Sequence, residues 1–347
     1  MYVPGNTNKT IIGQKVIAVN TTTGNTTDFL SLKAPDASFR PVGLSFSPDG
    51  NALYVASIGK TEQIKKLPTG EPIPLTMIWM HPDTGVIWRI TRSENVGLVE
   101  PPAKNLRLSP ELTVTANSGS LPTTSVLNLP RGYKMEPVLW NLNLPSSIAF
   151  DDKQNIYVGE EGYAYVGLTP PPRILKIDHN TGNVSVFVDR GLNYPMSDIT
   201  FHNGKLYVSN GGKISTVDMK GKLENIISAL PGIEDHYIDQ IVFNPTDKRM
   251  YFGVGTATNS GIVGKDNPWV KATPKQHDTP GKNITLAGVN FITKNFISPA
   301  PNDNAITGAY VPFNTTTHKG QVIKGDTKCS GCILSANPDG TDVKLVA

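Results

Sequence analysis

Short runs of alternating apolar and polar residues recur along the chain and predict β-hairpins. Four segments share one plan: a strand that ends in Phe, a turn rich in Asp, Asn, Pro or Gly, and a second strand centred on Tyr. The segments are PVGLSFSPDGNALYVAS from Pro41, PSSIAFDDKQNIYVGE from Pro145, PMSDITFHNGKLYVSN from Pro195 and IDQIVFNPTDKRMYFGV from Ile238. Alternation on both sides of such turns is typical of antiparallel hairpins.

A second half-motif of outer strands follows each of these hairpins, in most cases a strand pair with a tight polar turn. These segments are GVIWRI from Gly85, PRILKIDHNTGNVSVFV from Pro172, GGKISTVDMKGKLENII from Gly211 and GCILSANPDGTDVKLV from Gly331. Two hairpins make four antiparallel strands, and a repeat of about 40 to 50 residues is typical of propeller blades. The sequence therefore predicts an all-β fold, a β-propeller of four-stranded antiparallel blades, with residues 1–347 as a single domain. A β-sandwich is the alternative, but it would not repeat the two-hairpin unit.

The predicted blades are not all complete. The segment QKVIAVNTTTGNTTDFLSL, from Gln14, is a second hairpin with no first hairpin before it, and the sequence stops at KLVA, where another blade would begin. Four and a half blades are recognisable. Since an open blade edge leaves backbone groups unpaired, we expect either strands that the pattern does not reveal or an incomplete chain.

Two long stretches interrupt the blade pattern. Residues 93–130 are rich in Pro, Ser and Thr and predict a long surface connection. The strand after it, YKMEPVLWNL from Tyr133, is expected to be the outer strand of the blade that begins at Pro41. Residues 261–328 form a second long loop, inserted within a blade between its two hairpins. Long loops on a rigid scaffold commonly carry function, so we expect this insertion to contribute to a site.

Composition and charge narrow the class of partner. The chain has 347 residues and a formal net charge of +3, and its Lys and Arg residues are scattered. This argues against nucleic-acid binding and favours a small neutral partner. No apolar run reaches the roughly 18 residues of a membrane-spanning helix. The first residues, MYVPGNTNKT, lack the pattern of a signal peptide. Six Asn-x-Ser/Thr triplets nevertheless favour an extracytoplasmic or cell-surface location, although a chain rich in Asn and Thr also forms them by chance.

Several segments resemble one family. GYKMEPVLWNLNLPSSIAFDDKQNIYVGEEG, DHYIDQIVFNPTDKRMYFGVG and CILSANPDGTDVKLVA are similar to segments of the soluble quinoprotein glucose/sorbosone dehydrogenases. The resemblance implies a six-bladed propeller that oxidises a sugar with pyrroloquinoline quinone (PQQ) as hydride acceptor and calcium as a second cofactor. The family's Arg-Asn pair and calcium loop have no counterpart here, and the hairpin at residues 40–57 is expected last rather than first. We therefore expect a permuted or incomplete relative.

The resemblance also implies roles for individual residues. His236 stands at the place of the base that takes the proton of the sugar hydroxyl, a task that suits a side chain titrating near neutral pH. Glu234 and Asp235 beside it are candidates to orient or tune the ring. Arg40 and Lys60 stand where the family places cations that face the carboxylates of the cofactor, and both are the right chemical type for that. The alternative interpretation is that the side chains of Arg40 and Lys60 are simply solvated.

The sequence departs from the family pattern around the base. After His236, the chain has Ile238, Asp239 and Gln240 where the family usually has two glycines and an arginine. Thr256 stands where an aspartate often follows the GVG motif. These departures put the substrate contacts in question.

Cys329 and Cys332 form a Cys-x-x-Cys spacing. A zinc site would need two more ligands nearby, and a thioredoxin-like redox pair would need a βαβ setting, so neither fits. A local disulfide and a pair of free thiols both remain open, and an exported location would favour the disulfide.

Two other functions compete with the dehydrogenase. A non-catalytic propeller would keep the scaffold as a binding module without the cofactor site. A lactonase-like hydrolase would activate water on a metal held by Glu160, Asn210 and Asp239. The remaining histidines are predicted to be solvated turn or loop residues, with no two at metal-ligand spacing: His81, His179, His202, His277 and His318.

Overall fold

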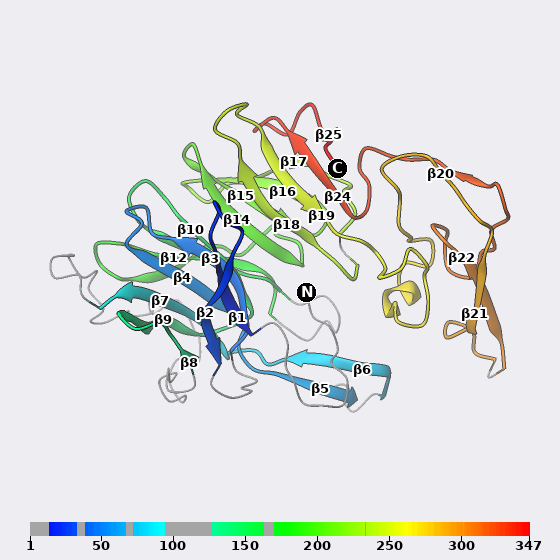
Figure 1. Ribbon diagram of the computed structural model, residues 1–347, viewed down its shortest axis with the longest axis horizontal. Coiled ribbons are helices and arrows are strands. Elements are labelled where there is room, and N and C mark those ends of the chain that lie inside the picture. Colours follow the sequence, from blue (N-terminus) through cyan, green and yellow to red (C-terminus); the bar gives the residue numbers. More distant parts are fainter. Residues whose placement is uncertain are drawn as a thin grey trace. The chain divides into compact units, whose positions relative to one another are not determined.

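The computed structural model describes residues 14–32, 39–66, 72–93, 127–162, 170–232, 234–300 and 302–347 (Figure 1). Within these ranges the chain is built from β-strands and one short 3-10 helix, η1 (Pro268–Lys271). The main sheets are small and antiparallel, and four of them have four strands. The predicted class, an all-β propeller of four-stranded antiparallel blades, is confirmed. Most of the predicted 93–130 connection lies outside the described residues.

The chain divides into two compact units. The N-terminal unit comprises residues 1–64, 77–163 and 168–190, and the C-terminal unit comprises residues 65–76, 164–167 and 191–347. No helix in the described ranges is long and apolar enough to cross a membrane.

Three blade-like sheets belong to the N-terminal unit. Sheet 1 contains β1 (Lys15–Val19), β2 (Thr26–Leu32) and β8 (Leu127–Asn128); sheet 2 contains β3 (Pro41–Phe46), β4 (Ala52–Ser57), β7 (Gly85–Arg92) and β9 (Tyr133–Leu142); sheet 3 contains β10 (Pro145–Phe150), β11 (Ile156–Glu160), β12 (Arg173–Ile177) and β13 (Val184–Val188). The strand predicted from Tyr133 is indeed the outer strand of sheet 2, where β9 pairs with β7. Between β4 and β7 in the chain, β5 (Thr61–Lys66) and β6 (Pro72–Met80) form an additional two-stranded sheet.

Apolar side chains on facing sheets form the core of this unit. One cluster joins sheets 2 and 3, and Tyr54 packs edge-on against Phe150 there, with ring centroids 5.0 Å apart. A second cluster joins sheets 1 and 2. Each fully buried aliphatic or aromatic side chain stabilises the fold by about 1.5–3 kcal/mol. The sheets also approach closely through backbone: a Cβ on Gly43 would lie 2.4 Å from the carbonyl oxygen of Ser146, so only glycine fits there.

Two four-stranded sheets and a long insertion make up the described part of the C-terminal unit after residue 191. Sheet 4 contains β14 (Met196–His202), β15 (Lys205–Asn210), β16 (Lys213–Asp218) and β17 (Leu223–Ile227); sheet 5 contains β18 (Ile238–Phe243), β19 (Met250–Val254), β24 (Cys332–Ala336) and β25 (Lys344–Leu345). Between β19 and β24 the chain forms η1 and two short hairpin-like pairs, β20 (Ile284–Thr285) with β23 (Val322–Ile323) and β21 (Asn290–Lys294) with β22 (Asn304–Gly308). Because β19 pairs directly with β24, the insertion leaves and re-enters the same sheet (Figure 1).

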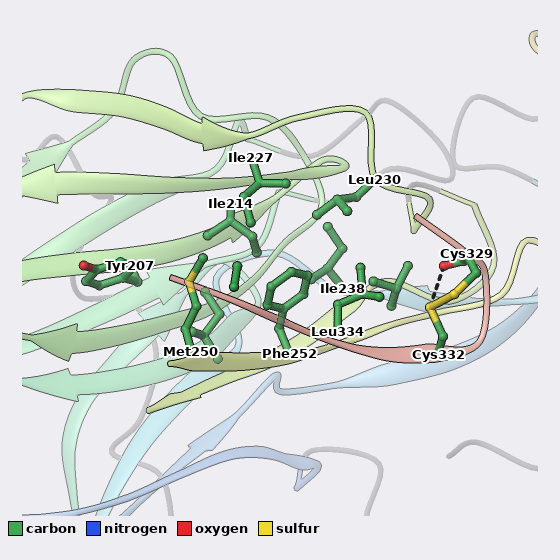
Figure 2. Packing of buried hydrophobic residues seen from close by; sticks show 13 residues of the cluster. Tyr207, Ile214, Ile227, Leu230, Ile238, Met250, Phe252, Cys329, Cys332 and Leu334 are labelled. Carbon is green, nitrogen blue, oxygen red and sulfur yellow. Dashed lines mark hydrogen bonds between the residues drawn. A yellow bond between two sulfur atoms is a disulfide. The ribbon is translucent and has the colours of Figure 1, made fainter. Parts of the chain in front are cut away.

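Figure 2 shows the core between sheets 4 and 5, where Phe252, Ile214 and Leu334 are fully buried. At the rim of this core, the His202 ring stacks on Phe243 with centroids 3.7 Å apart and planes 5° apart. The prediction that His202 is a solvated turn residue is therefore wrong. The imidazole sits at the end of β14, and its burial lowers the pKa of His202.

Candidate active site around His236

His236 lies in the turn that leads into β18. Its main-chain N–H donates to the carbonyl oxygen of Thr256 at 3.1 Å, and the N–H of Gly255 donates to the carbonyl of Tyr237 at 2.9 Å. These bonds continue the pairing of β18 with β19 beyond Val254. The end of this hairpin therefore places His236 directly beside Thr256.

A glycine makes this close approach possible. A Cβ on Gly255 would lie 2.3 Å from the carbonyl oxygen of His236 and 2.4 Å from its carbonyl carbon. Because those are backbone atoms, no side-chain rotation would relieve the clash. Gly255 thus determines where the backbone of His236 lies.

The His236 ring contacts two oxygen atoms of Thr256 through one nitrogen. Nδ1 of His236 lies 3.1 Å from the carbonyl oxygen of Thr256 and 3.0 Å from its hydroxyl oxygen. A carbonyl oxygen only accepts, so it bonds to a ring that carries its hydrogen on Nδ1, whereas the Thr256 hydroxyl can donate to a ring whose Nδ1 is unprotonated. In the tautomer with its hydrogen on Nδ1, Nε2 has the lone pair, on a residue that is exposed. This tautomer presents a proton acceptor to solvent.

Asp235 connects the His236 turn to the insertion. Its Oδ1 accepts the indole N–H of Trp269 at 2.9 Å, and its Oδ2 accepts from the amide of Asn267 at 2.7 Å. Burial raises the pKa of Asp235 to about 6, although the Trp269 N–H and the nearby His236 act in the opposite direction. The carboxyl group predicted to tune the ring thus also anchors the segment around η1.

Trp269 and Asn267 were missed by sequence reasoning. The only available signal was the lone tryptophan in the polar stretch KDNPWVK of the insertion, which alternation and turn patterns do not mark. Their partner Asp235 is more than thirty residues away along the chain.

The other residues near His236 in the chain are hydrogen-bonded to the scaffold or packed against it. Glu234 is buried, and its Oε2 accepts the N–H of Gly232 at 3.1 Å. Ile238 is part of the core. Asp239 lies against Gly253, and partial burial raises the pKa of its carboxyl group.

Arg40 and Lys60 lie at the same end of the β3–β4 hairpin, where Pro41 pairs with Ser57. The main-chain N–H of Arg40 donates to Oγ of Ser57 at 2.9 Å, and the N–H of Lys60 donates to Oγ1 of Thr84 at 2.9 Å. The Lys60 side chain is exposed. These two cations belong to the N-terminal unit, whereas His236 belongs to the C-terminal unit.

Two of the residues considered for a lactonase metal have other partners. Glu160 forms an ion pair with Arg173 and accepts the N–H of Asn143 at 2.6 Å. Burial raises the pKa of Glu160, and Arg173 opposes that shift. The amide of Asn210 donates to Oγ of Ser215 at 2.9 Å. Both side chains therefore hold the scaffold.

The described ranges contain no group of three or more His, Cys, Asp or Glu side chains that is placed to hold a metal ion. No cluster of carboxylates in these ranges thus stands for the calcium site that the family resemblance implies.

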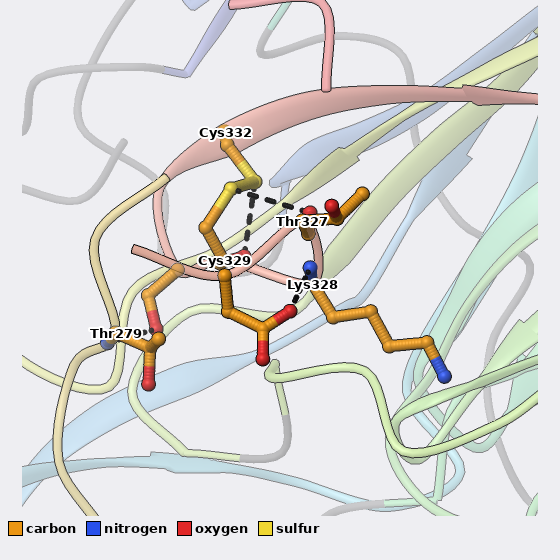
Figure 3. Close-up of a disulfide and its surroundings, with 7 residues drawn as sticks. Thr279, Thr327, Lys328, Cys329 and Cys332 are labelled. Carbon is orange, nitrogen blue, oxygen red and sulfur yellow. Dashed lines mark hydrogen bonds between the residues drawn. A yellow bond between two sulfur atoms is a disulfide. The ribbon is translucent and has the colours of Figure 1, made fainter. Parts of the chain in front are cut away.

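The two cysteines form a disulfide at the point where the insertion rejoins sheet 5 (Figure 3). Their Cα atoms are 6.1 Å apart, and both residues are buried. Cys332 opens β24 and pairs with Val254, the last residue of β19. The N–H of Gly331, between the cysteines, donates to the carbonyl of Gly255 at 3.2 Å. The disulfide therefore lies close in the sheet to the His236 turn.

No protein-family model matches the chain. No curated protein matches it either. Among solved structures, it is similar to a gluconolactonase from Xanthomonas campestris, with 14% identity over 69% of this chain and 62% of that one, and a TM-score of 0.39. It is also similar to an aldose sugar dehydrogenase from Streptomyces coelicolor in its PQQ-bound form, with 14% identity over 71% of this chain and 83% of that one, at a TM-score of 0.31. A nidogen–laminin complex gives 13% identity over 94% and 88% of the two chains, at a TM-score of 0.40. Likenesses this distant carry no argument about activity.

Proposed function

We propose that this protein oxidises a sugar in the manner of the glucose/sorbosone dehydrogenases, with His236 as the general base. The observation that carries the proposal is the contact of Nδ1 of His236 with the Thr256 carbonyl on an exposed residue: with the ring hydrogen on Nδ1, Nε2 is free to accept a proton. The family resemblance of the surrounding segments supports the same role.

In the proposed reaction, Nε2 of His236 accepts the proton of a sugar hydroxyl while a hydride leaves the carbon that carries this hydroxyl. The PQQ cofactor implied by the resemblance supplies the acceptor for the hydride. The imidazolium that forms keeps its Nδ1–H bonded to the Thr256 carbonyl, whose partial negative charge stabilises the cation. Protonation of Nε2 therefore leaves the hydrogen bond that orients the ring unchanged.

Arg40 and Lys60 remain our candidates for binding the carboxylates of the cofactor. Both are cations at one end of one hairpin, which is the chemistry that carboxylates require. We also propose an extracytoplasmic location. The Cys329–Cys332 disulfide supports it, because disulfides persist in oxidising compartments.

Turnover assays test the proposal. The protein is mixed with PQQ, with and without calcium, and dye reduction is followed across a panel of aldoses. We expect His236→Gln to lower kcat by roughly 100-fold or more while PQQ binding is kept. His318→Gln, at an exposed histidine of the insertion, is the matched control and should retain full activity. Absence of PQQ binding at micromolar concentration, or full activity in His236→Gln, would overturn the proposal.

A further inference from the structure

Asp278 of the insertion is buried and binds the two residues that follow Thr256 in the chain. It is 3% exposed. Its Oδ1 accepts the main-chain N–H of Ala257 at 2.7 Å, and its Oδ2 accepts from the N–H of Thr258 at 3.1 Å and from the hydroxyl of Thr258 at 2.5 Å. Each oxygen of Asp278 thus faces a main-chain donor, an arrangement that suits the ionised carboxylate, which only accepts.

The peptide group between Thr256 and Ala257 links Asp278 to His236. Its N–H donates to Asp278, and its carbonyl oxygen lies 3.1 Å from both the main-chain nitrogen and Nδ1 of His236. A trans peptide group is planar, and its C=O and N–H point in opposite directions. The bond to Asp278 on one side therefore sets the direction of the carbonyl on the other side.

The charge of Asp278 also makes this carbonyl a better acceptor. Hydrogen bonds to ionised groups are stronger than those between neutral groups, and hydrogen bonds in a chain polarise one another. Because the Ala257 N–H donates to a carboxylate, the Thr256 carbonyl oxygen gains negative charge and accepts a hydrogen from Nδ1 of His236 more strongly. The competing contact, in which the Thr256 hydroxyl donates to Nδ1, does not use this carbonyl.

The Cys329–Cys332 disulfide loop holds the segment around Asp278 in place. Thr279, the next residue, exchanges two bonds with Ser330 of this loop: the Ser330 N–H donates to the Thr279 carbonyl at 2.8 Å, and the Thr279 N–H donates to Oγ of Ser330 at 3.1 Å. Another main-chain N–H of the loop donates to the carbonyl of Gly255 at 3.2 Å. The loop therefore ties Asp278 and the end of β19 to the same short stretch of chain.

We propose that Asp278 is a positioning residue for His236. Acting through the peptide group between Thr256 and Ala257, it holds the His236 ring in the tautomer that carries its hydrogen on Nδ1. Nε2 then keeps its lone pair for the proton of a substrate hydroxyl. Orientation of a base by a third group is a common arrangement in enzymes, and here a peptide group stands between the two. The kinetic consequence rests on the proposed function, whereas the tautomer does not.

Nuclear magnetic resonance of the histidine side chains tests the tautomer without any turnover. The protein is labelled with ¹⁵N in its histidines and studied at about pH 8.5, where an ordinary imidazole is neutral. His236→Gln assigns the His236 signals. We expect the hydrogen mainly on Nδ1 in the wild type. In Asp278→Asn, which keeps the shape but not the charge, the ratio of this tautomer to the other should fall by roughly two- to tenfold.

Asp151→Asn is the matched control. Asp151 is buried in the turn between β10 and β11, and it also accepts two main-chain N–H groups, from Lys153 and Asn155, both at 2.9 Å. The control should leave the His236 signals unchanged. A wild-type ring with its hydrogen on Nε2, an unchanged ratio in Asp278→Asn, or an equal change in Asp151→Asn would overturn the inference. The wild-type measurement can contradict it even if Asp278→Asn does not fold.

Sugar oxidation assays measure the consequence for the proposed reaction. Asp278→Asn should lower kcat by about tenfold and leave KM within about twofold, because the base is misplaced while a buried residue does not contact the sugar. Asp151→Asn should keep both constants. Full kcat in Asp278→Asn would contradict the positioning role. If the wild type shows the expected tautomer but no turnover, the proposed function fails and the inference about Asp278 stands.

Discussion

The carboxylate of Glu160, at the end of β11, accepts the main-chain N–H of Asn143 at 2.6 Å, 17 residues earlier in the chain. A polar side chain thus holds the segment that leads into the first strand of the same hairpin. The same relationship occurs at two other hairpins: Asn210 with Asn193 at 3.2 Å, and Ser57 with Arg40 at 2.9 Å, each 17 residues apart. The repeat therefore encodes a side-chain bond that closes the open end of each of these hairpins.

The fourth hairpin departs from this plan. Val254 occupies the position of Glu160, and main-chain bonds from Gly255 to Tyr237 and from His236 to Thr256 close the end instead. Closure by backbone lets the side chains of His236 and Thr256 meet. The candidate base His236 thus lies at the hairpin that lacks the side-chain hydrogen bond by which the other three hairpins are closed.

Replacing the side chain of the closing bond should destabilise the fold. We expect Asn210→Ala to lower the free energy of unfolding by about 1–3 kcal/mol, because the N–H of the half-buried Asn193 loses its acceptor and the fully buried amide of Asn210 is removed. Urea denaturation followed by circular dichroism measures this. Asn180→Ala, in the exposed turn between β12 and β13, should change stability by less than about 0.5 kcal/mol. Equal losses in both variants would argue against a role for the closing bond.

The position of His236 should depend on Gly255. In Gly255→Ala the new methyl group meets the backbone of His236, so we expect kcat to fall by roughly 10- to 100-fold in the sugar oxidation assay. Gly253→Ala is the control: its Cβ would lie 3.2 Å from the carboxylate of Asp239, a side chain that can rotate. If Gly255→Ala has wild-type kcat, the backbone position of His236 does not limit activity.

Glu161 should make stability depend on pH. Burial raises the pKa of this carboxyl group from 4.5 to about 8 in the folded protein. Folded Glu161 keeps its proton up to about pH 8, whereas the unfolded chain releases it near pH 4.5. Its contribution is therefore fully present below pH 4.5 and is lost as the pH rises toward 8, by at most about 1.4 kcal/mol per pH unit.

Glu161→Gln removes this proton equilibrium. Chemical denaturation from pH 5 to pH 8 should show a smaller loss of stability with pH in the variant than in the wild type, with the variant the more stable at pH 8. Parallel curves for the two proteins would show that Glu161 does not titrate differently in the folded and unfolded states.

Local pattern was enough to predict the hairpins. The alternation within β3 and β4 and the Pro-Asp-Gly turn between them depend only on neighbouring residues. The outer strand from Tyr133 was recognisable from its local pattern in the same way. The environment of His202 was not predictable in this way. Its stacking partner Phe243 lies on another sheet. The local sequence around His202 predicts a turn but does not identify a distant residue that packs against the histidine ring.

By itself, the sequence determined the repeated hairpins, the four-stranded blades and the position of His236 at the head of β18, because side-chain alternation and turn chemistry are properties of neighbouring residues. Only the tertiary structure decided that Nδ1 of His236 bonds to Thr256 and that Asp235 holds Trp269. It also decided that Asp278 accepts the N–H of Ala257, on the peptide group whose carbonyl contacts the His236 ring. These features depend on which strands and loops meet in space, and segments far apart in the chain meet only when the sheets pack.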